Sequence, residues 1–302
     1  MVEVTSVRTK KKFGWLEHDN IIGYIFLSPF LLFLFFFMIL PIFQGLYMSF
    51  FDWSALTPPV FVGWGNFQTM FQDDVFWSSL WHTIYFVIIS TLPLVALGLA
   101  IALVLNKSFR GRFLVRGMFF FPYLLTVSVI ATIWRWLLQD HFGLINYYLG
   151  KIGLPQLNWL TEPNLAMVSI ALATIWWTVG FNVIIFLAGL QEIPEQLYEA
   201  AKIDGANSFQ SFCHITIPQL RPSMIFVLIT QIIASFQVFG QVNVMTAGGP
   251  FGSTRTMVQY IYEAGFKYLK MGYASALAYI LFAIMFICTI LQWKLLTTEN
   301  DE

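Results

Sequence analysis

Six long apolar segments constrain this chain more than any other feature of its sequence. A helix needs about 20 predominantly apolar residues to cross the hydrocarbon core of a bilayer, and each of the segments reaches that length. We expect membrane-spanning helices at about residues 21–43, 81–105, 117–138, 165–190, 222–245 and 273–294. The composition agrees, because charged residues make up 11% of the chain but about 25% of a soluble domain. The sequence therefore predicts an all-α, polytopic membrane protein with six transmembrane helices.

The segments that flank this membrane region are short. An arm of residues 1–20 precedes the region of residues 21–294, and a tail of residues 295–302 follows it. The first apolar run follows three lysines, as in a signal peptide, but it is too long and lacks a small-residue cleavage site. We therefore expect it to be a retained span. The prolines at or within the spans are expected to kink the helices without breaking them; these are Pro29, Pro41, Pro93 and Pro122.

The lysines and arginines of the short loops indicate an orientation, because such residues are enriched on the cytoplasmic side. They cluster in the N-terminal arm and after the second span, at Arg8, Lys10, Lys11, Lys12, Lys107, Arg110, Arg112 and Arg116. The loop after the first span has no basic residue and carries Asp52, Asp73 and Asp74. Three residues after the fifth span oppose this assignment, namely Arg255, Lys267 and Lys270. The overall bias predicts cytoplasmic N and C termini and a cytoplasmic loop at residues 191–221.

The predicted spans contain no aspartate or glutamate. Carriers driven by protons or sodium usually place a carboxylate near the middle of the membrane, where it binds and releases the coupling ion. The absence argues for an external source of energy and for a solute of little charge. An ion-coupled secondary carrier of a neutral solute is the alternative. A membrane-embedded enzyme would need paired carboxylates, a metal cluster or a nucleophile–base motif, and the sequence shows none.

Uncharged polar and aromatic side chains are nevertheless present in the last three spans. Amides beside aromatic rings can bind sugar hydroxyls and stack on sugar faces, but the same groups can also bond across helix interfaces and hold a bundle together. Gln237 and Gln241 are four residues apart and are expected to share one helical face. The candidate residues of a solute path are Thr174, Trp177, Asn182, Gln237, Gln241, Asn243 and Tyr279.

Arg135 stands between Trp134 and Trp136 at the predicted outer end of the third span. This arrangement is typical of an interfacial aromatic belt with an arginine that reaches toward water. A cation facing a solute path is the alternative interpretation, and the sequence leaves both open.

The 191–221 loop is polar and favours helix. Pro194 and Glu195 form a helix start, and Gly205 can end that helix with a left-handed residue. Asn207 can cap a second helix, and Pro218 lies where that helix should end. We expect a short helix–turn–helix in the cytoplasm. The alternative is an amphipathic loop that lies on the membrane surface.

The spacing in this loop resembles the signature of importer permeases of the ATP-binding cassette (ABC) superfamily: EAA, three residues, Gly, nine residues, then I-x-L-P. At those positions this chain has Glu199-Ala200-Ala201, Gly205, Ile215 and Pro218. The one departure is Ile217 at the leucine position, which is a conservative apolar change. Residues 187–206 and 246–250, with Ser28-Pro29 near the start, look like the carbohydrate-importer branch.

The resemblance implies that the loop couples this chain to a separate ATPase subunit. The residues that match the docking and turning positions are Glu199, Ala200, Ala201, Lys202, Asp204, Gly205 and Pro218. It also implies a second homologous permease, two ATPase subunits with ATP and Mg²⁺ bound to them, and an extracytoplasmic solute-binding protein. The chain itself has no G-x-x-x-x-G-K-[ST] phosphate loop, and we expect it to bind no cofactor or metal and to be no enzyme. Its net charge of +0 gives no reason to expect a nucleic-acid partner.

A last candidate is the loop at Gly248, Gly249 and Pro250, predicted to lie outside. Its composition indicates a flexible turn, and the resemblance implies an outer gate or a contact with the binding protein. Together these features predict a permease subunit in the cytoplasmic membrane of a prokaryote. We expect it to move a sugar or sugar-like solute by ATP-driven alternating access.

Overall fold

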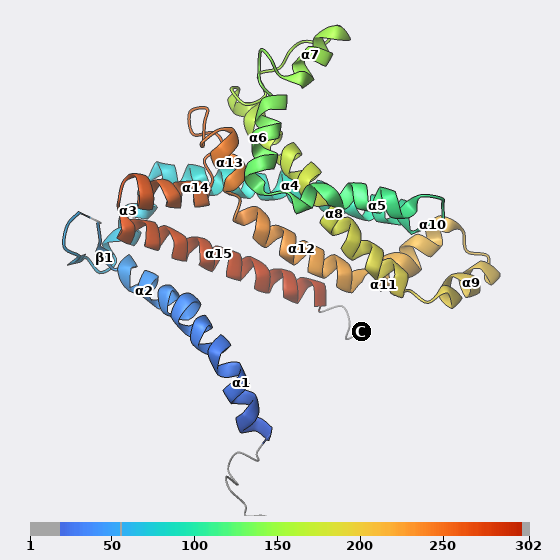
Figure 1. Cartoon of the computed structure of the whole chain (residues 1–302), viewed down its shortest axis with the longest axis horizontal. Helices are drawn as coiled ribbons and strands as arrows, with labels where there is room; N and C mark the ends of the chain where they lie inside the picture. The colour runs from blue at the N-terminus through green and yellow to red at the C-terminus, as the bar shows by residue number, and fades with distance from the viewer. Residues whose placement is uncertain (1–18, 55, 298–302) are drawn as a thin grey trace, which may run out of the picture.

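A computed structural model describes residues 19–54 and 56–297, and it is built almost entirely from helices (Figure 1). Most of the predicted N-terminal arm and the last residues of the tail lie outside the described residues. The elements in chain order are α1 (Asp19–Leu34), η1 (Phe35–Ile39), α2 (Leu40–Ser49), β1 (Phe51–Asp52), β2 (Val60–Phe61), α3 (Gly65–Phe71), α4 (Asp74–Asn106), α5 (Arg112–Phe120), η2 (Phe121–Leu124), α6 (Val127–Leu137), α7 (Leu144–Lys151), α8 (Pro163–Glu192), α9 (Glu195–Ile203), α10 (Ser208–Ser211), η3 (Phe212–Thr216), α11 (Ile217–Gln219), α12 (Arg221–Phe236), α13 (Gly240–Met245), α14 (Met257–Tyr262), η4 (Glu263–Lys267) and α15 (Met271–Thr297).

Four helices are long and apolar enough to cross a membrane: Gly23–Ser49, Asp74–Asn106, Pro163–Glu192 and Met271–Lys294. They overlap the first, second, fourth and sixth predicted spans. Two bent pairs of shorter helices, at residues 112–137 and 208–236, bring the number to 6 if each pair is one span. The structure thus supports a mostly helical chain with 4 to 6 candidate spans.

The prediction of an unbroken third span at residues 117–138 is wrong. The chain bends by 98° between Arg112–Leu124 and Val127–Leu137, because Leu125 and Thr126 are both extended, with ψ of 149°. Pro122 lies in the short 3-10 turn η2 just before the bend, where a proline removes a helical donor. The carbonyl of Leu125, freed by the break, accepts a hydrogen bond of 3.2 Å from Trp177 Nε1. By contrast, Pro93 lies inside α4 without ending it.

The fifth predicted span, residues 222–245, is also interrupted. Helix α12 ends at Phe236 and α13 begins at Gly240, so Gln237 and Gln241 do not share the helical face that their spacing predicted. The interruption lets α13 lie against α6: a Cβ on Gly240 would come within 2.8 Å of the Val127 side chain. Only glycine permits that approach.

The core of the bundle follows α4, which packs against α8, α12 and α14. Helices α4 and α8 approach closely at Gly98, where a Cβ would lie 2.9 Å from Asn182 Cβ. Buried Phe86 and Ile170 fill one part of this interface, and buried Leu94 and Phe186 fill another. The long apolar helices therefore bury their contact faces against each other.

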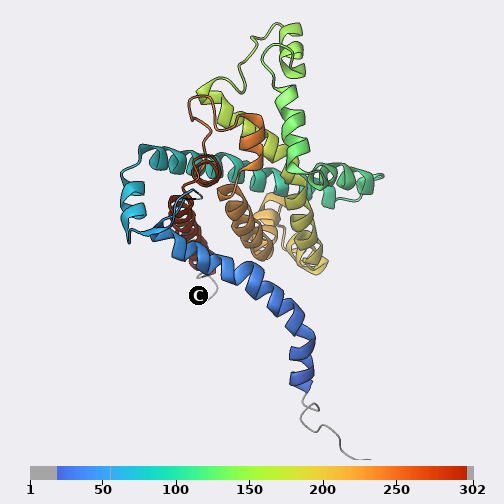
Figure 2. The same ribbon diagram turned by 60° about the vertical axis from the view of Figure 1, so that its left-hand side comes forward.

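The first helix stands away from this core. Both views show α1 running away from the bundle (Figures 1 and 2), and Phe26 on it is 81% exposed. Helix α2 returns to the bundle and contacts α15, where the Tyr279 hydroxyl donates a hydrogen bond to the carbonyl of Ile42. The exposed apolar surface of α1 is that of a helix whose surroundings are lipid or another protein.

Candidate functional site

The 191–221 loop forms two helical pieces joined by a tight turn. Helix α9 ends at Ile203, and Gly205 has a φ of 81°, in the left-handed region that favours glycine. The N–H of Ala206 donates to the carbonyl of Ala201 at 2.9 Å, which closes the turn. Asn207 then begins the next helix with a capping box, in which its side chain accepts from Gln210 N at 2.9 Å. Local hydrogen bonds therefore fix the turn.

Helix α9 presents an unpaired polar face. Glu199, Ala200, Lys202 and Asp204 are exposed, and Ala201 is half-buried. Neither Glu199, Lys202 nor Asp204 forms an ion pair with another described residue. The apolar tip beside them is Ile203, which is 85% exposed. These groups are free to bind a partner, and the small alanines allow its backbone to come close.

The candidate solute-path residues do not gather around one cavity. Thr174 donates to the carbonyl of Ile170 at 2.9 Å, within its own helix. Trp177 donates a hydrogen bond to the carbonyl of Leu125, and Tyr279 donates one to the carbonyl of Ile42. Gln237 is exposed at the end of α12, whereas Gln241 is buried in α13. Asn243 accepts from Gln259 Nε2 at 3.4 Å.

Asn182 belongs instead to a polar seam between α4, α8 and α12. It is fully buried, and its Nδ2 lies 3.5 Å from Gln231 Oε1. On the same side of α12, Ser235 Oγ lies 3.1 Å from Ser90 Oγ and 3.3 Å from Thr91 Oγ1. Ser90 and Thr91 were not among the predicted residues, although two adjacent hydroxyls in an apolar helix indicate an interhelical contact. These contacts indicate that the polar side chains of the seam stabilise the packing of the helices.

A pocket of about 720 Å³ lies where α6 meets α13, and we call it the Arg135 pocket. It brings Arg135 next to Gly249 and Pro250, two of the three residues of the candidate outer loop. Its other polar and aromatic lining residues are Thr132, Trp136, Gln139, Asp140, His141, Thr161 and Thr246. Arg135 donates to the carbonyl of Val244 at 3.3 Å and has no carboxylate partner among the described residues. Cationic, carboxylate, amide, hydroxyl and aromatic groups thus converge on one cavity.

The loop of residues 246–256 beside this pocket is fixed rather than flexible. Thr254 Oγ1 donates to the carbonyl of Gly249 at 2.6 Å and lies 2.7 Å from Thr246 Oγ1. Gly248 has a φ of 85°, a conformation that suits glycine. At the tip, Phe251 is 100% exposed. The loop is therefore a preformed turn that presents an aromatic ring.

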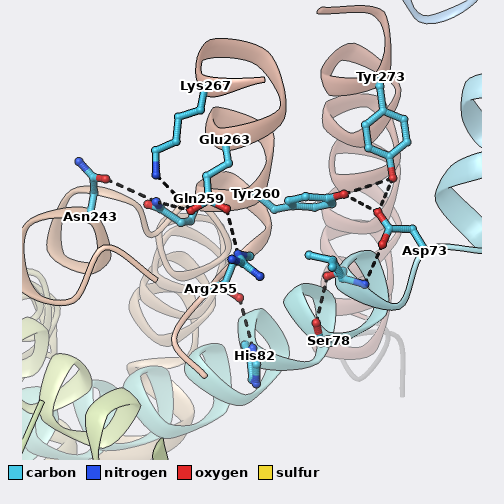
Figure 3. A network of polar contacts seen from close by, with 11 residues as sticks. Asp73, Ser78, His82, Asn243, Arg255, Gln259, Tyr260, Glu263, Lys267 and Tyr273 are labelled. Atoms are coloured by element: carbon cyan, nitrogen blue, oxygen red, sulfur yellow. Dashed lines mark hydrogen bonds and ion pairs between the residues drawn. The ribbon is translucent and has the colours of Figure 1, made fainter. Parts of the chain in front are cut away.

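The base of this loop is held by a buried carboxylate, Glu263, that pairs with two partly exposed cations (Figure 3). Arg255 Nε donates to Glu263 Oε2 at 2.9 Å, and Lys267 Nζ lies 3.4 Å from Glu263 Oε1. Gln259 Nε2 donates to the same carboxylate at 3.2 Å, and the carbonyl of Arg255 lies 3.3 Å from His82 Nδ1. Glu263 is 4% exposed, so this paired carboxylate is a structural anchor.

A second carboxylate, Asp73, lies beside the start of α15 (Figure 3). It caps α4 through Val75 N at 2.8 Å and accepts hydrogen bonds from the hydroxyls of Tyr260 and Tyr273. Partial burial alone would raise the pKa of the Asp73 carboxyl. The hydrogen bonds from the two tyrosines and from backbone N–H groups outweigh that effect and hold its pKa below the usual value. Burial, together with the bond to Asp73, raises the pKa of Tyr260 to about 12.

The described residues contain no group of three or more histidine, cysteine, aspartate or glutamate side chains that could hold a metal ion.

Comparison with known proteins identifies the family. Residues 94–295 match the model of the "binding-protein-dependent transport system inner membrane component" family, and this range includes the whole 191–221 loop. The sulfoquinovosyl glycerol transport system permease protein of Agrobacterium fabrum is 33% identical, over 99% of this chain and 98% of that protein. The trehalose/maltose transport system permease protein of Thermococcus litoralis is 34% identical, over 93% of this chain and 95% of that protein.

A solved structure shares the fold. It is the crystal structure of a bacterial ABC transporter involved in the import of the acidic polysaccharide alginate, with a TM-score of 0.83 and 23% identity. The match covers 96% of this chain and 100% of that chain.

Proposed function

The chain belongs to the family of binding-protein-dependent transport system inner membrane components, and from that premise we propose that it moves a sugar or sugar-like solute across the cytoplasmic membrane. As a member, it is a membrane permease subunit of an ABC importer and not an enzyme, and ATP is hydrolysed on a separate subunit. Two relatives are named as permeases for sulfoquinovosyl glycerol and for trehalose and maltose, and these names support a carbohydrate solute. The polar groups of the Arg135 pocket fit such a solute.

The 191–221 loop carries the mechanistic part of the proposal. Its helix α9 presents Glu199, Ala200 and Lys202 without partners in the described part of the chain, on a turn fixed at Gly205. We assign this face to the ATPase subunit. Closure of the ATPase subunits on nucleotide moves α9 in this proposal. The movement is transmitted through η3 and α11 to α12, which is part of a proposed span.

This assignment sets the rest of the topology. We count each of the two bent pairs, which are compatible with single spans by length and composition, as one crossing. We infer six crossings, with both termini and the 191–221 loop in the cytoplasm. The complete importer then contains a second homologous permease, two ATPase subunits that hold ATP and Mg²⁺, and an extracytoplasmic binding protein. The exposed apolar face of α1 fits the partner permease or lipid, because no other described element covers it.

The part of the molecule that contains α6 and α13, with the Arg135 pocket and the 246–256 loop, lies away from α9 (Figure 1). In the proposed orientation this part faces outward, where a binding protein delivers the solute. Phe251 presents an exposed aromatic ring to that protein, and Arg135 and Gln139 line the cavity beside the loop. We therefore assign residues 248–250 to the border of the outer gate.

The test is reconstitution of the complete importer in proteoliposomes with its binding protein outside and ATP inside. We expect accumulation of a labelled oligosaccharide or glycosyl glycerol that requires both ATP and the binding protein. Uptake that survives without ATP and stops with a proton uncoupler would contradict the proposal. Amino acids serve as a control, since they should not accumulate.

A further inference from the structure

A second cavity lies where α4 and α8 end and α9 begins, and we call it the Lys107 pocket. Its volume is about 730 Å³. Asn106 and Lys107 at the end of α4 form one wall, and Tyr198 and Lys202 on α9 form another. The pocket therefore lies between the main bundle and the helix that we assign to ATPase contact.

The pocket carries two uncompensated positive charges. Lys107 and Lys202 both line it, and both are exposed. Neither side chain forms an ion pair or hydrogen bond with another described residue. No aspartate or glutamate lines the cavity. Each lysine sits at a helix C-terminus, where a cation is favoured, and this accounts for each position singly. The helix-terminus effect does not explain why both lysines line the same cavity. Two positive charges at one cavity favour binding of an anion.

The rest of the lining is divided between apolar and hydroxyl groups. Leu103 and Leu190 belong to the last turns of two apolar helices, and Phe212 lies beside them in the lining. Ser208 and Ser211 add hydroxyl groups on the α10 side. A ligand that fits is anionic at one end and apolar at the other. Basic pockets between transmembrane helices are suited to lipid phosphate groups.

We propose that the Lys107 pocket binds the phosphate group of an anionic phospholipid. The phosphate lies between Lys107 and Lys202, and the glycerol and first methylenes lie against Leu103 and Leu190. A lipid in this position braces α9 against the end of α4. The site is separate from the solute path, so the importer can carry it whatever its solute. It shares Lys202 with the face of α9 that we assign to the ATPase subunit.

The test measures phosphatidylglycerol retained by the complete importer complex after exchange into phosphatidylcholine nanodiscs, by lipid mass spectrometry. We expect the wild type to retain phosphatidylglycerol. Retention should fall about fivefold for each lysine removed, because this factor corresponds to the binding free energy that one basic residue contributes near an anionic membrane surface. Lys107→Gln with Lys202→Gln should therefore lower it about 25-fold. Arg110→Gln with Arg112→Gln removes the same charge outside the pocket, and retention should stay within twofold of wild type.

A second variant covers the case in which the lysine variant fails to assemble. Ser211→Asp adds a negative charge to the pocket lining and leaves both lysines in place, and it should lower retention at least fivefold. Equal retention in wild type and Ser211→Asp, or an equal loss in the arginine control, would overturn the proposal. Displacement of the lipid by excess inorganic phosphate would show that the pocket prefers a soluble phosphate, and it would overturn the proposal of a phospholipid ligand. Because retention is measured without solute, failure here is distinct from failure of the transport proposal.

Discussion

The hydroxyl groups of Tyr198 and Thr216 lie 2.9 Å apart and join α9 to the helical segment that leads into α12. Thr216 is 5% exposed, so its hydroxyl depends on this bond. Tyr198→Phe leaves that buried group without its partner, at a cost of about 1–3 kcal/mol. If α9 transmits movement to α12, solute uptake per ATP hydrolysed should fall several-fold in this variant, measured in proteoliposomes.

The double variant Tyr198→Phe with Thr216→Val is the matched control. Replacing both partners by apolar groups of similar shape is close to neutral, so coupling should recover toward wild type. Coupling in the single variant equal to that of wild type would remove this bond from the transmission route.

Glycine is required at position 205 because of the backbone conformation there, and not because a side chain would collide with a neighbour. Its φ is 81°, and nothing lies within 4 Å of a Cβ built there. Gly205→Asn should therefore retain most uptake, because asparagine tolerates the left-handed region. Gly205→Val should lose most uptake while the protein stays in the membrane, because a β-branched residue is strongly disfavoured there. Membrane fractionation with an uptake assay checks both, and equal activity of the two variants would contradict the argument.

Gly180 is required for space. A Cβ at this position in α8 would lie 2.0 Å from the carbonyl oxygen of Phe119, on a backbone that cannot swing aside. Gly180→Ala should therefore cost about 1–3 kcal/mol, as overpacking does, and lower the unfolding temperature in detergent. Gly117→Ala is the control, because nothing lies within 4 Å of a Cβ there. An unchanged unfolding temperature for Gly180→Ala would show that α5 and α8 pack more loosely than described.

The Tyr260–Asp73 contact predicts a dependence of stability on high pH. The pKa of Tyr260 is raised from 10.0 to about 12, so its contribution is fully present below pH 10 and is lost as the pH rises toward 12. The stability difference between wild type and Tyr260→Phe should be constant from pH 7 to about pH 9 and shrink above pH 10. Thermal unfolding across this range measures it, and a difference that is constant at pH 11 would contradict the folded-state contact.

The positions of the long helices could be predicted from the sequence, because four apolar runs are uninterrupted and each forms one helix. The breaks could not be predicted. Pro93 and Pro122 look alike in the sequence, but Pro93 lies inside α4 and Pro122 lies beside a 98° bend. The difference depends on Trp177, which supplies a donor to the freed Leu125 carbonyl, and that partner is 52 residues away.

The candidate site was predicted in part. The turn residues Gly205 and Asn207 act locally, so spacing was sufficient to find them. The solute-path residues were chosen by polarity, and polarity does not say which face of a helix meets which neighbour. The shared helical face predicted for Gln237 and Gln241 is wrong because the helix is interrupted between Phe236 and Gly240. The pocket beside Arg135 depends on long-range packing of α6 and α13.

Cross-linking from α9 tests the central claim most directly. Ala200→Cys, exposed on α9, is placed in a background with Cys213→Ser and Cys288→Ser, and the complete importer is treated in its own membranes with a bifunctional maleimide. Phe251→Cys, which is exposed on the 246–256 loop, is the control. We predict that Ala200→Cys forms an adduct with the ATPase subunit, sensitive to bound nucleotide, and that Phe251→Cys forms none. An ATPase adduct from Phe251→Cys, or its absence from Ala200→Cys in an assembled and active complex, would contradict the coupling role of α9.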